Sequence, residues 1–147
     1  MTEEKKDFFV SDISLSYQYT AGNATTRFLN KVAEGKLVAQ KCPKCSAVYV
    51  PPRGSCPRCG VATEEELELP DTGAVESFTI VHIPIPGNPI VPPYVSAMIR
   101  LDGADISFLH LIQEIDLADI RIGMRVQAVW KDKSDWGTTL ELSLIHI

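Results

Sequence analysis

All four cysteines of the chain fall in two CxxC pairs that are ten residues apart, Cys42-Pro-Lys-Cys45 and Cys56-Pro-Arg-Cys59. A structural zinc site takes four ligands in a tetrahedron, and four thiolates leave no open position for a substrate. Each CPxC turn lets both of its sulfurs reach one metal, and two such turns joined by a short hairpin make a zinc ribbon. The spacing therefore predicts one structural zinc ion, bound by Cys42, Cys45, Cys56 and Cys59.

Two alternatives remain open for these cysteines. The same ligand set suits iron in a rubredoxin-like site, and the four thiols could instead form two disulfides. The N-terminal segment MTEEKKDFFV is charged and has no apolar signal core, so we expect a reducing compartment, which disfavours disulfides. No apolar run approaches the roughly 20 residues that span a bilayer. We expect a cytoplasmic protein that has no membrane segment.

The charge of the chain is unevenly spread. The net charge is −5, yet the 25 residues from Lys36 to Gly60 carry five cations and no acid. These cations can compensate the negative charge of a zinc tetrathiolate. A small site for anions or nucleic acid is the other interpretation, which the pI of about 5.1 disfavours because duplex binding needs a dominant basic face.

The segment before the ribbon is predicted to be an arm followed by a short helix. Residues 13–19 alternate apolar and polar side chains, which would suit a strand laid across another surface. In the helix, Thr25 or Thr26 can cap the start, Phe28 and Val32 share one face, and Gly35 can end it.

Five strands are predicted after the ribbon. They cover residues 74–83, 94–101, 106–112 and 125–130, and a last strand is marked by Leu140, Leu142 and Leu144. Asp102-Gly103 is a strong turn signal between the second and third. Five strands without crossover helices indicate a small antiparallel barrel of the OB type.

The expected fold is therefore mainly β, with a short N-terminal helix, a zinc ribbon and a C-terminal five-stranded OB-type barrel. We place the arm and helix in residues 1–36, the ribbon in 37–69 and the OB domain in 70–147. About twenty ribbon residues cannot bury a useful core, so metal binding, worth roughly 10–16 kcal/mol in zinc-finger peptides, must supply the folding free energy. We expect the barrel to have a separate core that persists without the metal.

In its order of motifs the chain resembles a bacterial and archaeal family of domains of unknown function, which combine a rubredoxin-like zinc ribbon with an OB fold associated with acyl-CoA. The resemblance covers about residues 25–135. The matching pieces, in addition to the two cysteine pairs and Gly60, are Phe28-Leu29, Gly35-Lys-Leu37, Pro51-Pro52-Arg53, Gly73-Ala-Val75, Ser77-Phe78-Thr79, Pro93-Tyr94-Val95, Leu101-Asp102-Gly103 and Ile122-Gly-Met-Arg-Val126. The apolar end at residues 140–147 departs from the Phe-x-Pro of many members.

The resemblance implies an accessory subunit that is not itself an enzyme. Members of this family are similar to scaffolds that support thiolase-fold acyl-CoA enzymes, such as acetyltransferases and lipid-transfer-protein-like aldolases. The arm sequence Tyr17-Gln-Tyr19-Thr-Ala-Gly22 looks most like actinobacterial members paired with aldolases that act on steroid side chains. The implied partner is thus a thiolase-fold acyl-CoA enzyme in a hetero-oligomer, with a role in lipid or steroid metabolism.

The residues show no catalytic motif. The four cysteines are assigned to the metal, and His82, His110 and His146 each fall in a predicted strand. His82 and His110 have apolar neighbours on their faces, which favours hydrogen-bonded core residues over general bases. The sequence has no GxSxG, no P-loop and no dinucleotide fingerprint.

One proline-rich loop looks suited to contact with a partner. Residues 83–93 contain five of the ten prolines, so the segment should be stiff and extended. Together with the arm it suggests partner contacts by Tyr17, Tyr19, Ile85 and Ile90. Two other functions stay open: a zinc-ribbon and OB protein that binds single-stranded nucleic acid, and a CoA-dependent enzyme that uses His82 or His110.

Overall fold

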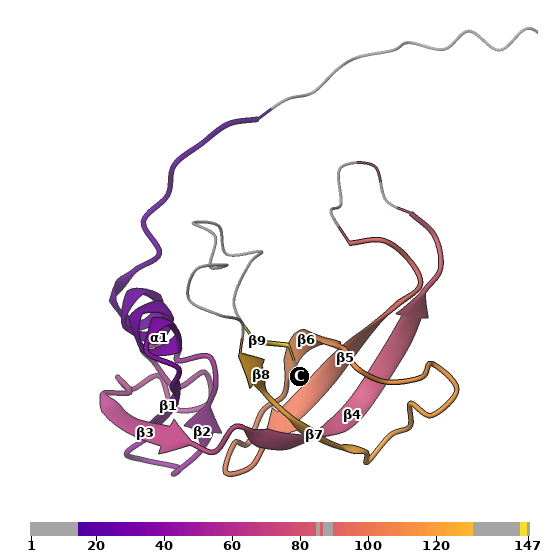
Figure 1. Ribbon diagram of the computed structural model, residues 1–147. Helices are drawn as coiled ribbons and strands as arrows, with labels where there is room; N and C mark the ends of the chain where they lie inside the picture. Colours follow the sequence, from indigo (N-terminus) through magenta and orange to yellow (C-terminus); the bar gives the residue numbers. More distant parts are fainter. Residues whose placement is uncertain (1–14, 85, 87–89, 131–144, 147) are drawn as a thin grey trace, which may run out of the picture.

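The structure is a computed structural model that describes residues 15–84, 86, 90–130 and 145–146. In this part of the chain one helix precedes a series of short strands (Figure 1). The elements are α1 (Asn23–Ala33), β1 (Leu37–Lys41), β2 (Val48–Tyr49), β3 (Glu65–Leu69), β4 (Thr72–Val81), β5 (Tyr94–Leu101), β6 (Phe108–Ile112), β7 (Arg125–Gln127), β8 (Val129–Trp130) and β9 (Ile145–His146). The expected mainly β fold with one short helix is confirmed.

Helix α1 ends where the sequence predicted and starts earlier. Gly35 has a φ of 79° and donates its N–H to the Val32 carbonyl at 2.8 Å, a geometry that glycine adopts without a steric cost. The prediction of a cap at Thr25 or Thr26 was wrong, because the helix begins at Asn23 and its N-cap is Gly22, which has no side chain. Val32 is buried on the face that also carries the half-buried Phe28.

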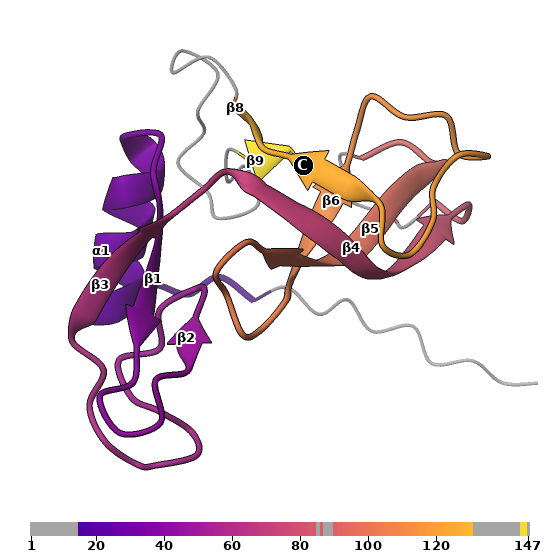
Figure 2. The ribbon, with the colours of Figure 1, turned by 90° about the horizontal axis from the view of Figure 1, so that it is seen from below.

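Strands β1, β2 and β3 form the ribbon sheet in the order β2-β1-β3, with both pairings antiparallel. The figures show α1 lying against β1 and β3, on one side of this sheet (Figures 1 and 2). The ion pair between Arg27 Nε on α1 and Glu66 Oε1 on β3, at 2.9 Å, joins the helix to the sheet.

The remaining strands form the OB domain. An antiparallel sheet in the order β6-β5-β4-β7 is accompanied by the pair β8–β9, and β9 lies beside β6 (Figure 1). Strand β5 has the predicted bounds. The predicted strand 125–130 is instead divided at Ala128 into β7 and β8. Ala128 is buried, and its N–H donates to the Asp71 carbonyl at 2.7 Å. The leucines at 140, 142 and 144 lie outside the described residues.

The ribbon and the barrel share one hydrophobic core, so the expectation of separate cores was wrong. Leu37, Val48 and Val50 of the ribbon belong to the same buried cluster as the barrel residues. The barrel contributes the buried side chains Val75, Val95, Ala97, Ile99, Leu101, Ile112, Ile120 and Ala128. The strands of the two sheets are also continuous through the short connection between β3 and β4 (Figure 2).

The connection between β5 and β6 makes a second contact with the ribbon. The Val48 N–H donates to Asp105 Oδ2 at 2.7 Å, and the Asp105 N–H donates to the Val48 carbonyl at 3.0 Å. Ile106 packs against the cluster formed by Cys42, Tyr49 and Cys56. These contacts explain why β6 starts at Phe108 and not at the predicted residue 106: the two residues before Ser107 dock on the ribbon.

Before α1, the described residues 15–20 are extended and exposed, and they lead away from the ribbon (Figure 1). The predicted strand at 13–19 is therefore absent from the described part of the arm. As for membranes, the one helix among the described residues, with 11 residues, is too short to span a bilayer.

Candidate metal centre

The two cysteine pairs sit on turns of the same geometry. In each, the first cysteine's carbonyl accepts an N–H from the residue after the second cysteine, at 2.9 Å: from Ser46 in the first turn and from Gly60 in the second. Both of these residues have a left-handed backbone, with φ of 61° and 67°. Each turn thus brings its pair of sulfurs to the same side.

The four sulfurs fit one tetrahedral metal ion. All four Sγ atoms lie within 4.8 Å of one another, and Cys45 Sγ is 3.7 Å from Cys56 Sγ. With a zinc–sulfur bond of about 2.3 Å, a tetrahedron separates its sulfurs by about 3.8 Å. The four cysteines are free and no disulfide joins them. The expected set of four ligands is therefore assembled, and the disulfide alternative was wrong.

Hydrogen bonds surround the two buried sulfurs. Cys42 Sγ accepts the N–H groups of Lys44 and Cys45, both at 3.4 Å. The hydroxyl of Tyr49, a side chain only 4% exposed, lies 3.3 Å from Cys56 Sγ and donates to it when that sulfur is a thiolate. This bond is the main reason why the pKa of the Cys56 thiol is lowered to about 6.

The sulfurs also act on one another and on Tyr49. The hydrogen bond to Cys56 and burial raise the pKa of the Tyr49 hydroxyl to about 12. Burial and the neighbouring sulfurs raise the pKa of the Cys59 thiol to about 12, because several thiolates this close repel one another when no cation lies between them. A divalent metal ion supplies the positive charge that lets all four ligands ionise together.

A buried amide holds the ribbon around this centre. Gln40 on β1 is fully buried, and its Oε1 accepts the Gly54 N–H at 2.9 Å and the Thr63 hydroxyl at 3.1 Å. It therefore links β1 to the segments on either side of the second cysteine pair. Neither Gln40 nor Tyr49 was predicted as a functional residue. For Tyr49 the sequence signal is its place between Val48 and Val50, because alternation along a strand puts it on the face opposite the core.

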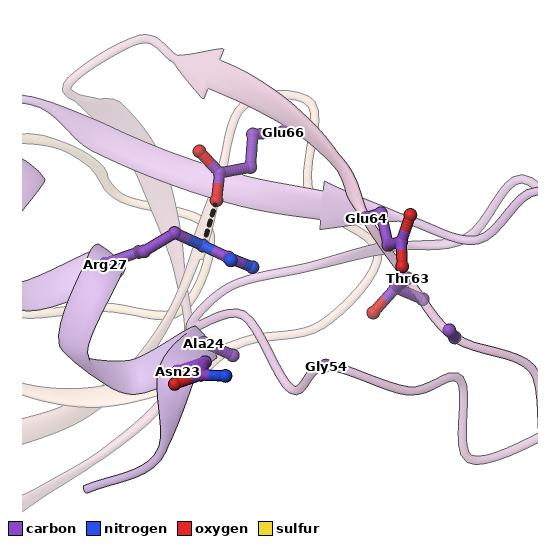
Figure 3. Close-up of a pocket in the computed structure, with 8 residues that line it drawn as sticks. Asn23, Ala24, Arg27, Gly54, Thr63, Glu64 and Glu66 are labelled. Atoms are coloured by element: carbon purple, nitrogen blue, oxygen red, sulfur yellow. Dashed lines mark ion pairs between the residues drawn. The ribbon is translucent and has the colours of Figure 1, made fainter.

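A pocket of about 480 Å³ opens between α1 and the ribbon (Figure 3). Arg27 and Glu66, joined by the ion pair described above, line one side of it, and Gly54 and Thr63 lie along its other side. The pocket contains none of the sequence-predicted site residues.

The histidines do not assemble a catalytic site within the described residues. His82 is exposed at the end of β4, so its interpretation as a core residue was wrong. His110 is half-buried, and its Nδ1 accepts the Leu111 N–H at 2.9 Å. Its ring meets Phe108 edge to face, with the centroids 5.9 Å apart. The side chain of His146 lies outside what the structure describes.

Of the four predicted partner contacts, the structure describes Tyr17, Tyr19 and Ile90, and none of them belongs to the cluster around the cysteines. Tyr17 and Tyr19 are 77% and 64% exposed, and their rings are 6.3 Å apart. Ile90 is half-buried, and Ile85 lies outside the described residues. In the same loop Ile83 and Val91 are highly exposed, as the proline-rich sequence suggested.

Two family models match the chain in succession. Residues 30–65 match the ChsH2 rubredoxin-like zinc ribbon domain, and residues 66–131 match the ChsH2 C-terminal OB-fold domain. The first match assigns zinc to the four clustered cysteines, which together form a centre for one zinc ion.

Two relatives align with about two thirds of the chain. A DUF35 domain-containing scaffold protein of Methanocaldococcus jannaschii is 37% identical over 97 residues, which are 65% of this chain and 67% of that protein. A probable enoyl-CoA hydratase alpha subunit of Thermomonospora curvata is 34% identical over 95 residues, again 65% of this chain but only 29% of that subunit. Most of the hydratase subunit therefore has no counterpart here.

Solved structures agree with these matches. A DUF35 protein of Sulfolobus solfataricus superposes with a TM-score of 0.60 at 27% identity, over 76% of this chain and 80% of its own. A chain of the Ltp2–ChsH2(DUF35) aldolase superposes with a TM-score of 0.64 at 28% identity, over 78% of this chain and 90% of its own. The chain belongs to the DUF35 family of zinc-ribbon and OB-fold proteins, the family of ChsH2.

Proposed function

We propose that this protein is a non-catalytic accessory subunit that binds and supports a thiolase-fold acyl-CoA enzyme. The observation that carries the proposal is the exposed apolar surface on the arm and on the loop between β4 and β5. Leu15, Tyr17 and Tyr19 on the arm, and Ile83 and Val91 on the loop, are between 64% and 82% exposed. Clusters of exposed apolar side chains are a common mark of interaction sites on soluble proteins.

The chemistry of the chain supports a role in binding. All four cysteines of the sequence are gathered in the metal centre, whose four thiolates leave no coordination position for a substrate. The carboxylate of Asp102 is held by Arg125 and by the Thr72 hydroxyl in a link between strands. These groups have structural partners and are poorly placed to act as a nucleophile and its base.

The relatives support an enzyme as the partner. One is described as a scaffold protein, and the aldolase structure contains a DUF35 chain together with Ltp2. From this likeness and the arm sequence we propose a thiolase-like aldolase or acetyltransferase, with steroid side-chain degradation as the pathway. Cysteines that bind a metal and form no disulfides are typical of a reducing compartment, so we place the complex in the cytoplasm.

Co-expression with a thiolase-like aldolase of the same organism, followed by size-exclusion chromatography, tests the proposal. We expect a stable complex in which the aldolase is active, and no acyl-CoA turnover by this chain alone. An interface of standard size would bury about 800 Å² on each partner. Separate elution of the two proteins, together with undiminished aldolase activity without this chain, would contradict the proposal.

Surface variants locate the contact. Replacing Tyr17 and Tyr19 with Ser, or Ile85 and Ile90 with Ser, should weaken the complex, since apolar anchors usually dominate binding energy. Ile122→Ser is the matched control, because Ile122 is 68% exposed but lies in the segment before β7. Equal affinity of all these variants would show that the arm and the loop do not form the interface.

The charges do not favour nucleic acid as the partner. In OB folds that bind single strands, cations on the barrel strands contact phosphates; here Arg100 on β5 forms an ion pair with Glu76 at 3.0 Å. Arg27, Lys31, Lys36, Lys41 and Arg125 are also paired with carboxylates. Binding of single-stranded DNA should therefore be lost by physiological salt, and submicromolar affinity at about 150 mM salt would reverse this assignment.

A further inference from the structure

The four sulfurs of the zinc centre differ in their access to solvent. Cys42 and Cys56 are 0% and 1% exposed, Cys59 is half-buried, and Cys45 is exposed. A reagent in solution therefore reaches Cys45 first. The zinc ion keeps all four sulfurs in the thiolate form, which is the reactive form of cysteine.

The sulfurs also differ in their hydrogen bonds. Cys42 Sγ accepts two backbone N–H groups, and Cys56 Sγ accepts the Tyr49 hydroxyl and two backbone N–H groups, those of Arg58 and Cys59. Among the described residues, no backbone N–H donates to the sulfur of Cys45 or of Cys59, and Cys45 Sγ lies 3.7 Å from Cys56 Sγ. A donated hydrogen bond withdraws charge from a thiolate and makes it a weaker nucleophile. Hydrogen bonding thus separates Cys45 and Cys59 from the two buried sulfurs, and the greater exposure of Cys45 separates it from Cys59.

We propose that Cys45 is the modification site of this centre, where hydrogen peroxide and other soft electrophiles react, and that Cys59 resolves the oxidised product. The Cys45 sulfur attacks one peroxide oxygen, so that an S–O bond forms, the O–O bond breaks and hydroxide leaves. The Cys59 thiolate then attacks the sulfenic sulfur, an S–S bond forms and a second hydroxide leaves. Two thiolates are oxidised to one disulfide by one peroxide molecule.

The geometry favours Cys59 as the resolving group. Its sulfur lies within 4.8 Å of the Cys45 sulfur, and it is the more accessible of the two cysteines in the second pair. Cys56 Sγ lies 3.7 Å from Cys45 Sγ, but it is held by the Tyr49 hydroxyl. The disulfide removes two of the four metal ligands, so oxidation should release zinc. Oxidation is then expected to loosen the contact of Ile106 with the ribbon.

The cleavage pattern of trypsin allows each cysteine to be followed separately. Lysine or arginine stands at positions 41, 44, 53 and 58, so each cysteine falls on its own peptide. The zinc-loaded full chain is treated with less than one equivalent of iodoacetamide, digested, and analysed by mass spectrometry. We expect the peptide of residues 45–53 to carry about tenfold more label than the peptides of Cys42 and Cys56, because a hydrogen bond to a charged group changes an equilibrium or rate by about that factor. Even labelling, or labelling led by any other cysteine, overturns the proposal.

Peroxide is the second probe, with zinc release read by a chromogenic chelator. We expect about one zinc released for each peroxide consumed, as the reaction above requires, and a disulfide linking the peptide of residues 45–53 to the one that starts at Cys59. A disulfide between Cys42 and Cys56, or zinc release without any disulfide, would contradict the assignment.

A matched pair of variants separates reactivity from metal binding, since Cys₃His sets also hold structural zinc. Cys45→His removes the attacked thiolate and should slow peroxide-driven zinc release about tenfold. Cys42→His also replaces one zinc ligand with histidine but keeps the exposed Cys45 thiolate, so it should release zinc about tenfold faster than Cys45→His. Equal rates for the two variants would refute the role of Cys45. If either variant fails to bind zinc, the labelling pattern of the unchanged protein decides.

Discussion

The hydroxyl of Tyr49 is the one side-chain donor outside the four cysteines that reaches a metal ligand among the described residues. Tyr49→Phe deletes this single oxygen and leaves the buried ring in place. The ring keeps its packing against Cys42 and Cys56 and its contact with the Arg53 guanidinium, which lies 6.0 Å from the ring centroid. Any change in the centre therefore reports the hydrogen bond to Cys56.

The expected size of the effect follows from the burial of this bond. A hydrogen bond to a charged group contributes about 1.5–3 kcal/mol. Groups that orient a metal ligand typically change metal affinity about 10–100-fold when removed. The distance of 3.3 Å and the 4% exposure of Tyr49 place this bond in a dry site where water cannot replace the hydroxyl. We therefore expect zinc to bind about tenfold more weakly in Tyr49→Phe.

Competition with a chromogenic chelator at pH 7.5 measures this zinc affinity. The cobalt-substituted protein gives a second readout, because the charge-transfer band of the thiolates should shift when Cys56 loses its donor. Tyr19→Phe is the matched control, since it deletes a hydroxyl from an exposed ring on the arm. A zinc affinity of Tyr49→Phe within about twofold of the control would refute the reasoning, because removing a group that hydrogen-bonds to a metal ligand should cost at least about tenfold.

Three further predictions concern the folded state. Gly73→Ala should destabilise the protein by about 1–3 kcal/mol in chemical denaturation, because a Cβ atom at Gly73 would lie 2.6 Å from the backbone oxygen of Arg100; an unchanged midpoint would contradict this. Ser46→Gly should stabilise the zinc-bound protein by about 0.5–1 kcal/mol. Glycine removes the steric cost of a left-handed backbone at this position, and this gain outweighs the larger conformational entropy of the unfolded chain. A loss of stability would show that Ser46 carries no such steric cost. Arg125 and the Thr72 hydroxyl hold the pKa of the Asp102 carboxyl well below its usual range, so the ionised group stabilises the fold above about pH 4 and this contribution is lost as the pH falls further. The stability difference between the unchanged protein and Asp102→Asn in urea should therefore shrink below about pH 4; a difference that stays constant with pH would exclude this ion pair as its source.

The metal centre and the class of fold could be predicted from short-range patterns. The spacing of the cysteines is enough to predict two turns that bind one ion. Each turn is held by backbone hydrogen bonds between residues no more than five positions apart. Strand β5 was also predicted with its observed bounds, because Val95, Ala97, Ile99 and Leu101 alternate along it and all are buried. Periodicity is informative where one face of a strand is fully covered.

The features that were missed depend on contacts between distant parts of the chain. The bond from the Val48 N–H to Asp105 joins residues 57 positions apart, so no local pattern announces it. Asp102-Gly103 was correctly identified as a turn, and Gly103 has a φ of 87°. The residues after it extend the connection to reach the ribbon, and β6 is shortened as a result. The helix start was misplaced because a threonine hydroxyl is a visible capping signal, whereas the backbone at Gly22 caps the helix with a φ of 79° and no side chain. The domain limits at residues 36 and 69 stay predictions.

Strand β2 explains why a zinc ion matters to the whole protein and not to the ribbon alone. Its two residues face opposite ways: Val48 lies in the core shared with the barrel, while Tyr49 lies against the sulfurs. The backbone of Val48 is in turn bonded in both directions to Asp105 of the β5–β6 connection. The metal thus fixes the position of β2, and β2 fixes the barrel relative to the ribbon. An accessory subunit that contacts its partner through an arm before α1 and a loop after β4 needs a constant spacing between those two surfaces. In the proposed role, a closed four-thiolate site is suited to this task, because it holds both parts of the molecule in one arrangement without taking part in a reaction.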